Sequence, residues 1–124
     1  MQLAQENPDF TYVLRGASEA GVLVNQETFT RSFLLTPHRI VQDWRPTSAA
    51  DLTPDDMLAL LELEPALVLL GTGPRQRFPS AAAMAALLTR GIGIEVMDSG
   101  AAARTFNVVA TEGRKVVVAF LLPG

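Results

Sequence analysis

A short segment, GTGPRQR at residues 71–77, brings together residue types that could hold an anion. Its two glycines would let the backbone approach a ligand closely, and its two arginines would supply positive charge. The segment has no P-loop lysine, and Gln76 stands where a dinucleotide-binding fingerprint needs its third glycine. The segment therefore predicts either an anion or partner site, or only a tight turn at which a buried strand leaves a sheet.

A second group of polar residues lies further along the chain. Glu95 is the one charged residue in the apolar run IGIEVM, and Asp98, Arg104 and Asn107 follow it. If this run is a central strand, the Glu95 carboxyl faces a covered side of the sheet and needs either a partner or a raised pKa. The pattern predicts either a general acid–base group or an ion pair with an arginine at the rim of the sheet.

The sequence contains no complete catalytic or metal-binding constellation. It has no cysteine, and its one histidine, His38, lies far along the chain from Ser99, which is not in a G-x-S-x-G elbow. HExxH and EF-hand spacings are also missing. We therefore assign no catalytic residue, no metal ligand and no cofactor, and we expect His38 to lie at the surface.

The composition is that of one globular domain without membrane insertion. Of the 124 residues, 48% are hydrophobic and 19% are charged, and no run approaches the ~20 apolar residues of a membrane helix. Residues 1–73 carry four arginines against ten acids, and residues 74–124 carry six bases against three acids. The bases are too scattered to predict nucleic-acid binding. The start of the chain has no signal-peptide pattern, which predicts a cytoplasmic protein, and residues 1–9 are expected to be flexible.

The back half of the chain predicts a β-α-β-α-β unit. The apolar runs ALVLLGTG, IGIEVM and KVVVAFLLP are typical of buried strands. Between them, one helix is expected from Ser80 as N-cap to Gly91, and another from Asp98 or Ser99 to Gly113. An earlier helix is expected to begin at Thr53, followed by proline at the first helical position and acids in the first turn.

The front half of the chain predicts β structure. Residues 28–34 alternate in polarity and are expected to form a half-exposed strand, and RIVQDWRP at residues 39–46 a further short strand. The fold expected from all these elements is a single α/β domain over residues 1–124. It has three layers, with a mixed central sheet, the C-terminal β-α-β-α-β unit and N-terminal antiparallel strands.

The segments LLGTGPRQRFP and GIGIEVMDSGAAARTFNVVATEGRKVVVAFLLP resemble a known family. They are similar to the Mth-domain family, which includes mitochondrial respiratory complex I assembly factors and adipogenesis-associated Mth-domain proteins. The resemblance covers roughly residues 10–122 and depends on the combination of the glycine turn, E-V-M-D, A-x-x-T-[FY]-N and E-G-R. Ser99 stands where the family often has threonine. The resemblance implies a single α/β domain and, from the eukaryotic members, a partner-binding or assembly role, with no catalytic residues to carry over.

These observations leave three functional hypotheses. The first is a non-enzymatic domain that binds a protein partner, in assembly of a respiratory or other membrane complex. The second is a protein that binds or converts a small anionic metabolite, with Glu95 and Asp98 as acid–base groups and arginines as a clamp. The third is a small homo-oligomer held by contact between its oppositely charged halves. The candidate pocket residues are Gly71, Thr72, Gly73, Arg75, Arg77, Glu95, Asp98, Arg104 and Asn107.

Overall fold

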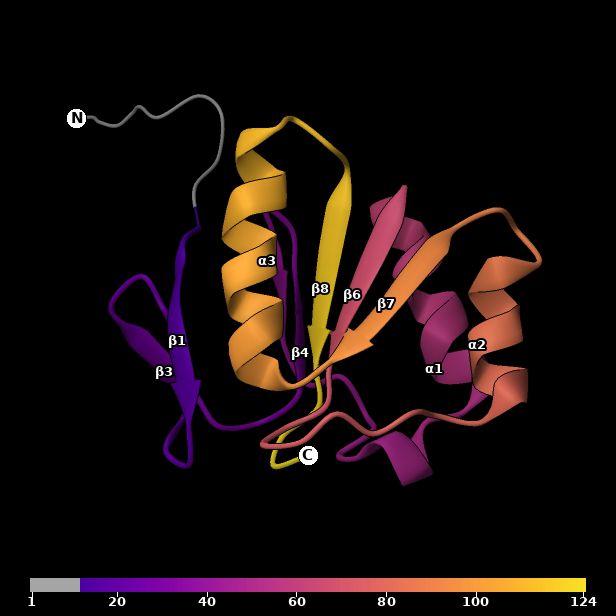
Figure 1. The fold of residues 1–124 in the computed structure, drawn as a ribbon, viewed down its shortest axis with the longest axis horizontal. Coiled ribbons are helices and arrows are strands. Elements are labelled where there is room, and N and C mark those ends of the chain that lie inside the picture. Colours follow the sequence, from indigo (N-terminus) through magenta and orange to yellow (C-terminus); the bar gives the residue numbers. More distant parts are fainter. Residues whose placement is uncertain (1–11) are drawn as a thin grey trace.

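The computed structural model describes residues 12–124 and shows a mixed five-stranded sheet at the centre of the domain (Figure 1). The predicted flexible segment, residues 1–9, lies outside the described residues. The strand order is β5-β4-β8-β6-β7. These strands are Phe33–Leu35 (β4), Ile40–Val41 (β5), Leu67–Gly71 (β6), Gly93–Met97 (β7) and Val116–Phe120 (β8).

The C-terminal β-α-β-α-β unit is confirmed. Strand β6 pairs in parallel with both β7 and β8, while β4 runs antiparallel to β8 and to β5. The crossovers are α2 (Ala81–Leu88) and α3 (Ser99–Thr111). Every residue of β6 and β8 is buried, as expected for apolar strands with both faces covered.

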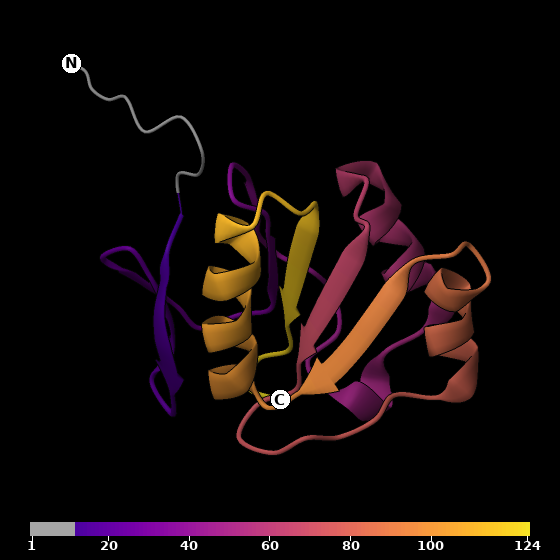
Figure 2. The same cartoon turned by 45° about the horizontal axis from the view of Figure 1, so that its top comes forward.

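A second, three-stranded antiparallel sheet packs against the outer side of α3. It contains β1 (Leu14–Ser18), β2 (Gly21–Val24) and β3 (Glu27–Phe29). Figures 1 and 2 show α3 between this small sheet and the central sheet. Ala102 and Phe106 of α3 are fully buried in the core that also contains the packed rings of Phe33 and Phe120. The N-terminal strands therefore do two things, since β4 and β5 extend the central sheet and β1–β3 flank α3.

The opposite face of the central sheet is covered by α2, by α1 (Pro54–Leu58) and by the 3₁₀ helix η3 (Ala59–Leu63). Thr53 is the N-cap of α1, as predicted, and forms a capping box with Asp56. Trp44, buried between a 3₁₀ turn at Ala49–Asp51 (η2) and α1, donates from its indole to the Asp56 carbonyl at 3.2 Å. This core holds α1 and α2 against the sheet.

One local prediction is wrong, and another is confirmed only in part. The strand expected over residues 28–34 is interrupted, because β3 ends at Phe29 and β4 begins at Phe33 in the other sheet. At this crossing the buried Ser32 hydroxyl accepts the Leu122 amide and donates to the Pro46 carbonyl. The strand expected over residues 39–46 shortens to Ile40–Val41, since Trp44 turns into the core.

The described residues, 12–124, contain no helix long and apolar enough to cross a membrane.

Candidate functional site

Strand β6 leaves the central sheet through Gly71 and Gly73, and both glycines are required by close packing. A Cβ on Gly71 would lie 2.8 Å from a ring carbon of Phe120. Gly73 has φ +91°, and a Cβ there would lie 2.8 Å from the Gly124 Cα and 2.9 Å from the Pro123 carbonyl oxygen. The tight strand exit considered from the sequence is therefore present.

Thr72 is fully buried and fixes the segment that follows it. Its hydroxyl lies 2.5 Å from the Arg75 carbonyl oxygen and 3.2 Å from that of Met97, and it accepts the Arg77 amide at 3.0 Å. The Thr72 amide donates to the Met97 carbonyl at 3.0 Å. One side chain thus ties residues 75–77 to the end of β7, which gives the segment a defined shape.

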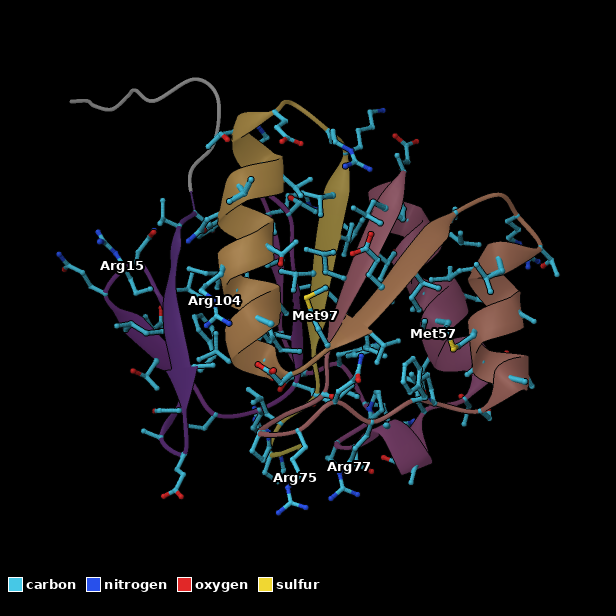
Figure 3. All side chains as sticks on the ribbon, viewed as in Figure 1. Arg15, Met57, Arg75, Arg77, Met97 and Arg104 are labelled. Atoms are coloured by element: carbon cyan, nitrogen blue, oxygen red, sulfur yellow. The ribbon has the colours of Figure 1, made fainter. Side chains whose placement is uncertain are left out.

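The segment held in this way is a surface loop, here named the arginine loop (residues 74–78). All five residues are exposed, and Phe78 keeps 65% of its surface accessible. Figure 3 shows Arg75 and Arg77 pointing outward from the edge of the molecule where β6 ends. The side-chain amide of Gln76 donates to the Val96 carbonyl at 2.9 Å, so the loop is also attached to β7.

The N-terminus of α3 lies against the same strand exit. Asp98 is the N-cap, and its carboxylate accepts the Ala101 amide at 2.8 Å. The Ser99 amide donates to the Gly73 carbonyl at 2.8 Å, and the Ser99 hydroxyl accepts the Gly73 amide at 2.9 Å. Ser99, where the family often has threonine, therefore has a structural task at this turn.

A cavity of about 680 Å³ opens between this turn, the tip of the β1–β2 hairpin and the C-terminal segment. The predicted residues Gly73 and Asp98 line it, together with Ser99 and Gly100. The hairpin contributes Glu19, so the charged side chains of the lining are two carboxylates. The lining includes neither arginine of the arginine loop, which does not favour an anionic ligand in this cavity.

Glu95 lies elsewhere and is exposed, because β7 is an edge strand of the sheet rather than a central one. The covered position that the sequence suggested for this carboxyl is therefore not found. In the described part of the chain no ion pair with Glu95 is formed. Glu95 therefore has neither the burial nor the charged partner expected of a general acid–base catalyst.

The last two predicted residues lie on the side of α3 that faces the small sheet. Arg104 is exposed, and one of its guanidinium nitrogens comes within 3.5 Å of where a Cβ on Gly100 would be. Asn107 clamps β1, because its side-chain oxygen accepts the Leu14 amide at 3.0 Å and its amide donates to the Leu14 carbonyl at 2.6 Å. Asn107 therefore attaches the small sheet to α3.

A charged network that the sequence analysis missed lies at α1. The Arg45 guanidinium donates to both carboxylate oxygens of Asp56, at 2.9 and 2.6 Å, and to Asp51 at 3.1 Å. The hydrogen bonds from Arg45 hold the pKa of the Asp56 carboxyl below its ordinary value, against desolvation by burial, which raises it. The same contacts raise the pKa of Arg45. The signal available in the sequence was the pair of aspartates, Asp51 and Asp56, that follow Arg45 within 11 residues.

Within residues 12–124 no group of three or more His, Cys, Asp or Glu side chains is arranged to hold a metal ion. The predicted residues also do not converge on one site. The cavity lined by Gly73 and Asp98 includes neither Glu95 nor the loop arginines, and the Asn107 side chain binds Leu14 instead.

Comparison with known proteins identifies the class of this α/β domain. Residues 14–121 match the family described as protein of unknown function (DUF498/DUF598), and the chain belongs to that family. An NMR structure from Xanthomonas campestris is 50% identical, covers 100% of this chain and 94% of its own, and superposes with a TM-score of 0.85. A Bordetella pertussis NMR structure, described as a Mth938-like domain, is 28% identical, covers 100% and 94% of the two chains, and has a TM-score of 0.80.

A relative named for its role is the human NADH dehydrogenase [ubiquinone] 1 alpha subcomplex assembly factor 3. It is 34% identical to this chain over 105 residues, which is 83% of this chain and 56% of the human protein. The chain therefore spans little more than half the length of that relative. The resemblance to the Mth-domain family inferred from the sequence motifs is confirmed.

Proposed function

We propose that this protein is a partner-binding domain that acts in the assembly of a respiratory membrane complex. The observation that carries the proposal is the 34% identity to the human assembly factor, which extends over 83% of the present chain. The family match covers residues 14–121, which include the whole of α3 and the arginine loop, rather than a short motif. Since the chain matches only 56% of that relative, the partner is proposed for the shared domain alone.

The geometry supports binding better than catalysis. Among the described residues, Glu95, Asp98 and the two loop arginines do not meet at one cavity, so no acid–base pair and anion clamp face a common substrate. The strand exit instead uses its polar groups to hold its own backbone, through Thr72 and Ser99. A fixed surface with unused polar side chains is suited to a protein partner.

The experiment is capture of the tagged protein, at native expression level, from the cells that encode it. We expect subunits of NADH dehydrogenase to be enriched over a capture with an unrelated tagged protein of the same size. Removal of the gene should lower the amount of assembled complex in membranes, measured on native gels, and the restored gene should recover it. Normal assembly without the gene, together with no enrichment of these subunits, would contradict the proposal.

The cavity of about 680 Å³ favours a second candidate function, binding of a small molecule. Its volume is that of ordinary ligand sites. Because Glu19 and Asp98 are its charged lining groups, a ligand with an amine or hydroxyl group fits it better than an anionic metabolite. A thermal-shift screen with matched amines, alcohols and carboxylates tests this, since a ligand of the native state raises the melting temperature. If no amine or alcohol at millimolar concentration raises the melting temperature, this candidate function is wrong.

A further inference from the structure

We infer that the arginine loop (residues 74–78) is the surface through which the protein docks on its partner, and that it binds a carboxylate-bearing protein surface with an apolar recess. This inference rests on the proposed function and names the surface that performs it. Arg75 and Arg77 would contact carboxylates, and Phe78 would enter the recess. The contacts of the loop with the rest of the molecule support this assignment.

The backbone of the loop is fixed before any partner binds. The Thr72 hydroxyl, fully buried, contacts the Arg75 carbonyl at 2.5 Å and accepts the Arg77 amide at 3.0 Å. On the other side, Gln76 donates to the Val96 carbonyl. Successive carbonyls along a strand point to opposite sides. The Met97 carbonyl points toward β6 and accepts the Thr72 amide, so the Val96 carbonyl, which accepts from Gln76, lies on the outer edge of β7. Fixed loops lose less conformational entropy on binding.

Apart from Gln76, the long side chains of the loop do not hold the fold together. Within the described residues, neither Arg75 nor Arg77 forms a side-chain hydrogen bond or an ion pair, and Figure 3 shows both pointing away from the ribbon. Phe78 is 65% exposed, although an aromatic ring of that size is normally buried. In contrast, the next residue, Pro79, is buried and starts the approach to α2. The loop thus presents two free cations beside one exposed ring.

These residue types indicate what the loop would bind. A guanidinium presents a rigid fork of donors that matches a carboxylate in a bidentate arrangement. Arginine and aromatic side chains are the types most enriched among residues that dominate the energy of protein–protein interfaces. Two arginines are too few for the broad basic surface that nucleic acids or anionic membranes require, and the chain as a whole carries a net charge of −3. An acidic protein surface is therefore the occupant we propose.

The first test compares captures by four variants of the full chain. Arg75→Glu/Arg77→Glu and Phe78→Ser change the loop, and Arg15→Glu and Leu88→Ser are matched controls. Arg15 is exposed on the small sheet, away from the loop in Figure 3, and Leu88 is 52% exposed on α2. We expect the loop variants to lower recovery of NADH dehydrogenase subunits about tenfold or more. Equal recovery by loop variants and controls, with unchanged melting temperatures, would overturn the inference.

The second test does not depend on the identity of the complex. Benzoylphenylalanine is placed at position 78 or, as control, at Leu88, and the cells are irradiated. We expect a crosslink from position 78 to a different protein, at a site beside Asp or Glu side chains. Replacing those acidic residues of the partner by lysine should restore its binding to the Arg75→Glu/Arg77→Glu variant. If that protein is not a respiratory subunit, the loop assignment stands and the proposed function fails. Adducts only to a second copy of this chain, to lipid or to nucleic acid, or no adduct, would overturn the assignment.

Discussion

The buried hydroxyl of Thr72 accepts the backbone N–H of Arg77 at 3.0 Å, across the turn that ends the central strand β6. The same oxygen contacts the carbonyls of Arg75 and Met97. A threonine in the segment for which the sequence predicted either an anion or partner site or a tight turn therefore binds its own chain. This contact makes the conformation of the arginine loop depend on one side chain, and it can be tested without knowing the partner.

Replacing Thr72 by valine keeps the shape of the side chain and removes the hydroxyl. We expect a loss of about 1–3 kcal/mol in the free energy of unfolding, because the Arg77 amide loses its partner in a partly buried setting. Faster amide exchange should be confined to residues 75–77. Thr72→Ser retains the hydroxyl and should keep the slow exchange. Equal exchange in the valine and serine variants would show that another contact holds the loop.

Gly73 and Gly91 provide a second comparison, since both have positive φ, at +91° and +76°. A Cβ on Gly91 meets nothing within 4 Å, so Gly91→Ala should cost only the strain of the left-handed conformation, about 1–2 kcal/mol. Gly73→Ala adds contacts of 2.8 and 2.9 Å with backbone atoms, which must move. We therefore expect a clearly larger loss for Gly73→Ala by urea denaturation. Equal losses would contradict the close packing at this turn.

Local signals were enough to predict the C-terminal unit. The caps Thr53, Ser80 and Asp98 all accept the amides expected of them, because capping depends on neighbours in the chain. The apolar strands β6 and β8 are buried throughout, since a run without polar alternation needs cover on both faces.

The parts that could not be predicted depend on contacts between distant residues. Alternation over residues 28–34 continues through the crossing between the two sheets, and the break is marked by contacts of Ser32 with Pro46 and with Leu122, which is 90 residues away. The sequence of β7 does not reveal that it is an edge strand, because the apolar residues on one of its faces still pack against α2. Glu95 was misplaced for that reason.

Asn107 joins α3 to Leu14 by two hydrogen bonds over a separation of 93 residues. Asn107→Ala leaves both backbone groups of Leu14 without this partner, and we expect about 1–3 kcal/mol of destabilisation. Amide exchange should increase more in β1 and β2 than in β6 and β8, because the small sheet loses its attachment. Asn107→Asp keeps the acceptor but faces the Leu14 carbonyl with a negative charge, so it should not rescue. Uniform acceleration in all strands would contradict a local clamp.

The Arg45–Asp56 pair predicts a pH dependence. Because Arg45 lowers the pKa of Asp56 from the ordinary value of 3.8, the pair stabilises the fold above that value and loses its contribution as the pH falls through the lower, folded pKa. The difference in unfolding free energy between the protein and Asp56→Asn should therefore be full at pH 7 and shrink below pH 3.8. Asp43→Asn, at the exposed pair with Arg31, is the control and should change stability little. A difference that stays constant into acid would contradict the assignment.

Glu95 gives the last prediction, which concerns association rather than catalysis. It lies exposed at the middle of β7, an edge strand whose outer side has no partner strand among the described residues and is contacted by the Gln76 side chain at the Val96 carbonyl. A second β7 pairing there in antiparallel register about position 95 would bring two carboxylates face to face, so the charge should oppose edge-to-edge association. We expect Glu95→Val to increase dimers and larger species in light scattering as concentration rises, with little change in melting temperature. Glu112→Val, exposed at the end of α3, is the matched control. Equal association of the two variants would show that added hydrophobicity alone, and not the sheet edge, is responsible.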